Sequence, residues 1–141
     1  MGYSNPTGYS LIIHDDAEDD LDAIFDENED AGAALVVLLE LLKTDQDLLD
    51  RLTKRNFVNY GTPHFSVDEW QEARKTKHNL WRIRDLSSND AGGYRIVYAF
   101  HPQELKYYVL AILGREIVYD TANPRVARIF EIYDTYNIPR Y

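Results

Sequence analysis

The hydrophobic pattern of this 141-residue chain changes its period near residue 78. Before that point, apolar residues recur every three to four positions, as at Leu35, Leu38, Leu39 and Leu42, which is the spacing of an amphipathic helix. After it, three segments alternate or are rich in β-branched and aromatic residues, as strands are: residues 79–85, 94–100 and 105–113. A chain with its helices first and its strands later is expected to adopt an α+β fold.

The N-terminal part is expected to contain one strand and a helical hairpin. Residues 9–14 form a short β-rich run, and the acidic residues from Asp15 onward suit the positive end of a helix. A second helix is predicted over residues 31–43. We therefore assign residues 15–44 to an acidic helical part.

Residues 45–77 are predicted to be an inserted helical segment. Asp45 can cap a short third helix that ends before the loop at residues 59–63. Ser66 and Glu69 have the spacing of a capping box, which predicts another helix ending near Lys77.

The sheet is expected over residues 79–120, as an antiparallel meander. Turn-rich links at residues 87–93 and 101–104 are short enough to join antiparallel neighbours, and residues 116–120 could add a short last strand. Asn123 and Pro124 open a C-terminal helix predicted over residues 124–136. The whole chain, 1–141, is interpreted as one domain whose helices cover one face of the sheet.

The negative charge is confined to one region of the chain. Residues 1–50 contain 14 acidic residues and one lysine, giving −13, whereas residues 51–141 have a net charge of +4. This acidic region either forms a solvated outer helix face or folds over a basic surface and competes with its ligand. The chain has no cysteine, no secretory signal is visible, and the apolar stretch at residues 31–42 is too short to cross a bilayer. A cytoplasmic protein without membrane contact is expected.

Arginines are the candidate functional residues of the sheet. Alternation places Arg82 and Arg84 on one face of their strand, with Trp81 and Ile83 on the other. Arg95 lies one strand later, and Arg115 follows the third strand. Because the planar guanidinium group matches pairs of phosphate oxygens, four converging arginines would form a phosphate site. The other interpretation is an ordinary solvated sheet face.

Three motifs in this order resemble the RelE/ParE superfamily of bacterial toxins, particularly its RelE-type mRNA interferases. They are Trp81-Arg82-Ile83-Arg84, then Tyr94-Arg95-Ile96-Val97-Tyr98, then Gly114-Arg115 with Val118-Tyr119. The resemblance covers residues 79–120 in detail, and residues 9–44 match only in architecture. It implies a RelE-like fold with an N-terminal strand, a helical hairpin, an antiparallel sheet and a terminal helix.

The resemblance implies a toxin of a type II toxin–antitoxin system, with a protein antitoxin, the ribosome and mRNA as partners. The implied reaction is ribosome-dependent cleavage of mRNA without a metal or another cofactor, in which the ribose 2′-hydroxyl attacks the adjacent phosphate. Arg95 and Arg115 would hold the phosphate, Arg82 and Arg84 would occupy the positions of a basic pair, and Tyr119 would orient or deprotonate the nucleophile. Trp81 could stack on a base, although a place in the core is the other interpretation of its pattern.

The general base and the activity itself are open at this stage. Relatives often have lysines in the first motif, whereas arginine stays protonated and cannot act as a base. The candidates for the base are Tyr119, Glu116 or a histidine. The alternative function is a binding protein of the same fold without nuclease chemistry, either a gyrase-inhibiting ParE-type toxin or a phage or accessory interaction protein. A merely structural domain is a third interpretation.

Overall fold

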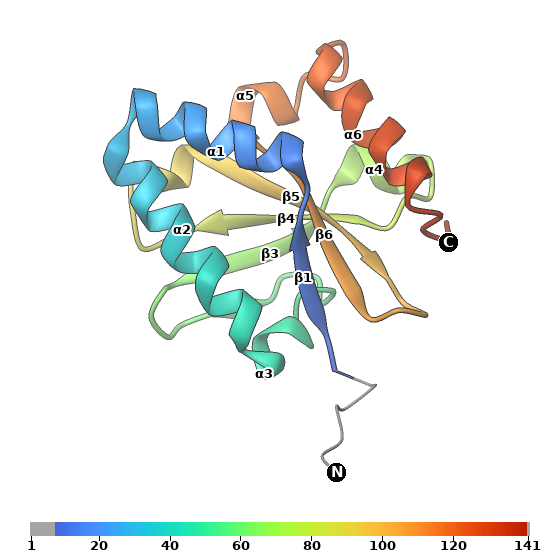
Figure 1. The fold of residues 1–141 in the computed structure, drawn as a ribbon, viewed down its shortest axis with the longest axis horizontal. Helices are drawn as coiled ribbons and strands as arrows, with labels where there is room; N and C mark the ends of the chain where they lie inside the picture. The colour runs from blue at the N-terminus through green and yellow to red at the C-terminus, as the bar shows by residue number, and fades with distance from the viewer. Residues whose placement is uncertain (1–7, 141) are drawn as a thin grey trace.

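Six strands form one mixed sheet in the computed structural model, which describes residues 8–140. The sheet order is β1-β6-β5-β4-β3-β2, and only β1 and β6 are parallel (Figure 1). The strands are β1 (Ser10–Ile13), β2 (Val58–Asn59), β3 (Phe65–Glu69), β4 (Leu80–Asp85), β5 (Tyr94–His101) and β6 (Lys106–Gly114). The helices are α1 (Asp15–Glu27), α2 (Glu29–Thr44), α3 (Gln46–Leu49), α4 (Gln71–Lys75), α5 (Arg115–Val118) and α6 (Pro124–Thr135), with a 3₁₀ turn, η1, at Ala91–Gly93. The predicted α+β class is confirmed, as are the N-terminal strand, the helical hairpin, the three-strand meander and the C-terminal helix.

Local capping explains where the long helices begin. The His14 Nδ1 atom accepts a hydrogen bond from the Asp16 amide at the start of α1. The Asn28 side chain accepts from the Ala31 amide at the start of α2. Asn123 does the same for Arg125 in α6, where Pro124 occupies the first helical position. No helix within residues 8–140 has both the length and the apolar character needed to cross a bilayer.

The sheet is covered on both faces, not on one as the sequence analysis predicts. One core lies between the sheet and the α1–α2 hairpin and includes Leu35, Leu38 and Tyr98. A second core lies between the opposite face and α4 and α6, and includes Val97 and Ile129. The central strands β5 and β6 are buried on both sides, which explains why their sequences are almost continuously apolar rather than alternating.

The start of the helix predicted at Ser66 is wrong, because residues 65–69 form strand β3 and the helix, α4, begins only at Gln71. Phe65 and Val67 are two positions apart and both point into the first core, while the whole strand pairs with β4. The Glu69 carboxylate binds the Arg55 side chain instead of capping a helix. Local capping signals are overridden here by pairing with the edge of the sheet.

The expected strand at residues 116–120 is also wrong. Strand β6 ends at Gly114, and the chain turns at once into α5. This turn places Val118 in the second core and leaves Arg115 and Tyr119 on the surface. The correction matters for function, because Arg115 and Tyr119 belong to a single helical turn and not to a strand.

Candidate functional site

Arg82, Arg84 and Arg95 lie on one face of two neighbouring strands. In the antiparallel pair of β4 and β5, Arg82 lies opposite Val97 and Ile83 lies opposite Ile96. Continuing this register by one residue brings Arg84 opposite Arg95, and side chains two positions apart share a face. The predicted alternation therefore places three guanidinium groups side by side.

Arg115 reaches the same region from the next strand. Strand β6 pairs Leu113 with Arg95 and Gly114 with Tyr94, so Arg115 follows directly after the residue that ends this ladder. Arg84 and Arg115 line one cavity of about 320 Å³. The rest of its wall comes from the end of β4 and the following loop, and includes Asp85, Ser88, Asn89 and Gly92. Two exposed guanidinium groups therefore face a shared hollow of a size that suits a phosphate group with its attached sugar.

Tyr119 joins the arginine cluster through its aromatic ring. The Cζ atom of Arg82 lies 5.6 Å from the centroid of the Tyr119 ring, which is a cation–π contact. The Tyr119 amide donates to the Arg115 carbonyl oxygen at 3.3 Å, so one turn of α5 holds both residues. The Tyr119 side chain is 45% exposed and can reach a ligand.

Arg95 is the buried member of the cluster, with only 3% of its surface exposed. Its Nη1 group donates to the carbonyl oxygens of Gly92, at 2.9 Å, and Tyr94, at 3.0 Å. Burial lowers the pKa of Arg95, a hydrogen bond with Tyr119 opposes this effect, and the positive charges of Arg84 and Arg82 lower the pKa further. Arg95 therefore brings a desolvated positive charge close to the other two guanidinium groups.

Carboxylates leave most of this positive charge unpaired. Arg82 has an ion pair with Asp68, at 3.7 Å between Nη2 and Oδ2. Within residues 8–140, neither Arg84, Arg95 nor Arg115 forms an ion pair. The cluster is thus an electropositive surface able to bind an anion.

Asp85 lines the cavity and was not among the expected site residues. Its Oδ1 atom accepts hydrogen bonds from the Ser87 amide, at 2.8 Å, and the Ser87 hydroxyl, at 2.6 Å. Its Oδ2 atom is buried and has no hydrogen-bond partner among the described residues. The Asp-Leu-Ser sequence after a strand is typical of a side-chain-capped turn, and this signal could have placed Asp85 at the base of the loop.

Trp81 does not lie with the arginines. Its side chain packs in the first core on the opposite face of β4, and its Nε1 group donates to the Asn79 side chain at 2.7 Å. The candidate bases, Tyr119 included, do not line this cavity. None of the four histidines lines it, and the Glu116 carboxylate faces a neighbouring hollow with Glu27 and Asp90. Tyr119 is the proposed base that the structure brings to the cluster.

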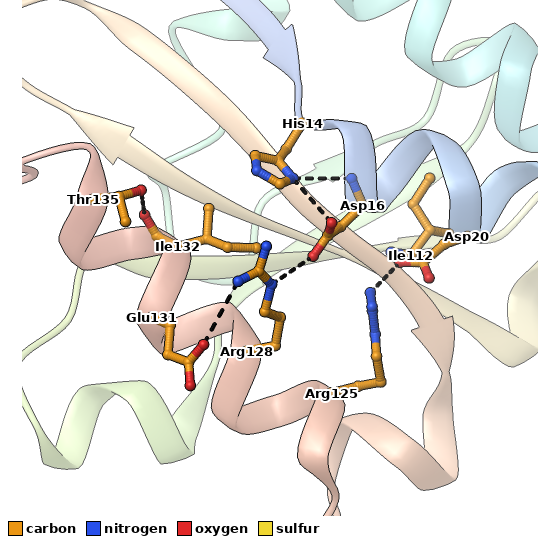
Figure 2. A network of polar contacts seen from close by, with 9 residues as sticks. All are labelled: His14, Asp16, Asp20, Ile112, Arg125, Arg128, Glu131, Ile132 and Thr135. Atoms are coloured by element: carbon orange, nitrogen blue, oxygen red, sulfur yellow. Dashed lines mark hydrogen bonds and ion pairs between the residues drawn. The ribbon is translucent and has the colours of Figure 1, made fainter.

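The acidic helix α1 pairs with arginines of α6 instead of the arginine cluster. Asp20 accepts from Arg125 at 2.7 Å, and Asp16 accepts from Arg128 at 3.0 Å. Figure 2 shows these contacts bridging α1 and α6 beside strand β6, where Asp20 also accepts from the Ile112 amide. Burial raises the pKa of Asp20, while the Ile112 amide and Arg125 oppose that rise. Two carboxylates of the acidic segment, Asp16 and Asp20, therefore have cationic partners on α6.

No metal-binding cluster of three or more His, Asp or Glu side chains occurs in the described part of the chain.

Comparison with solved structures shows a structural similarity. No family model and no curated protein matches the sequence. A chain from the crystal structure of the archaeal RelE-RelB complex from Pyrococcus horikoshii OT3 is similar, with 16% identity and a TM-score of 0.42. The match covers 77% of this chain and 97% of that chain.

Proposed function

We propose that this protein is a RelE-like toxin of a type II toxin–antitoxin system that cleaves mRNA on the ribosome. The observation that carries this proposal is that Arg84 and Arg115 line one cavity, while Arg82 and Arg95 both interact with Tyr119. The motifs that resemble the mRNA interferases supply these same five residues. The protein antitoxin, the ribosome and the mRNA are proposed partners on the strength of that sequence resemblance.

The proposed reaction is an internal transfer at phosphorus. The ribose 2′-oxygen bonds to the adjacent phosphorus atom, the bond to the 5′-oxygen of the next nucleotide breaks, and the products are a 2′,3′-cyclic phosphate and a free 5′-hydroxyl. The proton of the 2′-hydroxyl leaves to a base, and another proton goes to the departing 5′-oxygen. Negative charge builds up on the phosphoryl oxygens in the transition state.

The arginine cluster suits the charge that develops in this reaction. Arg84 and Arg115 line the cavity and would bind the two free phosphoryl oxygens. Arg95 would add positive potential from its buried position. Such preorganised donors lower the barrier because they need no rearrangement as charge develops. Arg82 would hold the Tyr119 ring in place through the cation–π contact.

Tyr119 is the proposed group for proton transfer to or from the ribose. It is exposed, lies next to two guanidinium groups and follows Arg115 on the same helical turn. The Tyr119 hydroxyl can both donate and accept a hydrogen bond, whereas arginine has no acceptor and keeps its proton in proteins. Asp85 supports the loop that forms the other wall of the cavity.

Expression without an antitoxin provides the test. We expect wild-type protein to arrest growth and to produce cuts within translated codons, detected by primer extension on cellular mRNA. Cells that express Arg115→Ala should grow normally and keep these messages intact, because the variant lacks a donor for the phosphate. Arg115 is exposed, so its loss should not affect folding. Arrest without mRNA cuts, together with loss of DNA supercoiling, would instead indicate a gyrase-inhibiting protein of the same fold.

A further inference from the structure

A second cavity, with a volume of about 450 Å³, lies at the end of β3 and beside α4. Its lining residues are Arg55, Glu69, Arg74, Lys77 and Trp81. It shares none of them with the cavity of Arg84 and Arg115, and Trp81 lies on the opposite face of β4 from Arg82. Three cations and one carboxylate give this lining a net charge of +2.

Glu69 draws two of these cations together from separate parts of the chain. Its side chain is only 12% exposed. The Oε1 atom accepts from the Arg55 Nε and Nη2 groups at 3.0 and 2.7 Å, and the Oε2 atom lies 3.6 Å from the Arg74 Nε atom. One carboxylate thus fixes two guanidinium groups at the cavity without cancelling their combined charge.

Lys77 supplies the third cation from a backbone position that favours glycine. Its φ angle is 62°, in the left-handed region. The Lys77 amide donates to the Arg74 carbonyl, and the His78 amide donates to the Ala73 carbonyl, which together form a Schellman motif after α4. Glycine is the usual residue at this position, yet the chain has a lysine there, and this lysine has no ion pair within residues 8–140.

We propose that this second cavity binds a phosphate-bearing ligand with at least two negative charges. Two fixed guanidinium groups and a free ammonium group match such a ligand in charge and in hydrogen-bond donors. The volume lies within the range of ordinary small-ligand sites. The ligand's phosphates could belong to a free nucleotide or to an RNA chain, and the site does not depend on the activity proposed for the first cavity.

The Lys77→Gly variant makes the test independent of folding. Glycine relieves the backbone strain at this position, so the melting temperature should stay the same or rise while the charge is lost. The variant is made in an Arg84→Gln/Arg115→Gln background, which removes the exposed cations of the first cavity. Lys77→Arg in the same background keeps the charge and serves as the matched control.

Binding is measured by calorimetry with pyrophosphate, a nucleoside triphosphate and a short single-stranded RNA. The indole N–H signal of Trp81 in ¹H–¹⁵N spectra reports occupancy, since Trp81 lines the cavity whereas Trp70 is fully buried elsewhere.

We expect the background protein to bind pyrophosphate with a shift of the Trp81 signal. Lys77→Gly should weaken this binding about tenfold or more, and Lys77→Arg should retain it. Tighter binding of the triphosphate than of RNA would indicate a free nucleotide, and the reverse would indicate an RNA chain. No binding of any of these probes to the background protein, or equal binding by Lys77→Gly, would overturn the proposal.

Discussion

The guanidinium group of Arg82 lies over the ring of Tyr119, with 5.6 Å between Cζ and the ring centroid. This contact joins strand β4 to the turn of α5 through two residues that are 37 positions apart in the sequence. It also brings the cationic cluster to the one exposed hydroxyl that is proposed to move a proton. Tyr119 therefore has two roles that can be tested separately. Its ring packs against Arg82, and its hydroxyl is proposed to transfer a proton.

Replacing Tyr119 by phenylalanine should remove the hydroxyl that transfers the proton and keep the ring in place. The phenylalanine ring can still pack under Arg82 but cannot hydrogen-bond to Arg95, so the melting temperature should fall only slightly. We expect RNA cleavage to fall about 10²-fold, as for the loss of a general acid or base. Single-turnover cleavage rates and thermal unfolding check this. Tyr119→Ala should lose at least as much activity, and a fully active Tyr119→Phe would limit Tyr119 to holding Arg82.

Arg84→Gln and Arg115→Gln should each lower the cleavage rate about 10²–10³-fold, because each removes a donor for the developing phosphoryl charge. Both side chains are exposed, so folding should be unaffected. The matched control is Arg140→Gln, an exposed arginine paired with Asp134 and absent from the lining of the first cavity. Cleavage rates equal to that of the control would remove these two arginines from the site.

Arg95→Ala should lower both activity and stability. The Arg95 Nη1 group satisfies the carbonyl oxygens of Gly92 and Tyr94, and its removal would leave these acceptors without that donor. We expect a loss of about 1–3 kcal/mol in the free energy of unfolding, measured by urea titration. An Arg95→Ala protein with unchanged stability would contradict the structural role of this buried side chain.

His78 should make the fold sensitive to mild acid. Burial lowers the pKa of His78, with the positive charge of Arg140 contributing, so the folded state favours the neutral ring. This preference contributes fully above the ordinary pKa of 6.5, and it is lost as the pH falls through the lower pKa of the folded protein. The free energy of unfolding should therefore fall as the pH falls below 6.5, and less so in His78→Gln. A His78→Gln protein with the same pH dependence as the wild type would contradict this assignment.

Much of the architecture follows from local sequence patterns. The helices α1, α2 and α6 and the strands β4, β5 and β6 are strongly periodic or strongly apolar, and their positions agree with the prediction to within a few residues. Strand β3 could not be predicted in the same way, because Ser66 and Glu69 resemble a helix start and the deciding interaction is the long-range pairing with β4. The second helix layer was missed because the apolar face of α6 does not reveal which face of the sheet it covers.

The same distinction applies to the candidate site. Strand alternation was enough to place Arg82 and Arg84 on one face, and the strand order brings Arg95 beside them. Alternation does not predict how deeply a side chain is buried. Arg95 is buried, whereas Arg84 is exposed. Asp85 enters the cavity only because the loop after β4 folds back through Gly92, where an added Cβ atom would lie 3.2 Å from the Asp85 carbonyl oxygen.

The most direct test of the central claim is to incubate the purified protein with mRNA on programmed ribosomes and to identify the ends that it creates. The proposed transfer predicts cuts at the codon in the ribosomal A site, each with a 2′,3′-cyclic phosphate and a 5′-hydroxyl, and predicts that Arg115→Gln slows them at least about 10²-fold. Intact mRNA after incubation with the folded wild-type protein, or cuts that persist at full rate in Arg115→Gln, would contradict it.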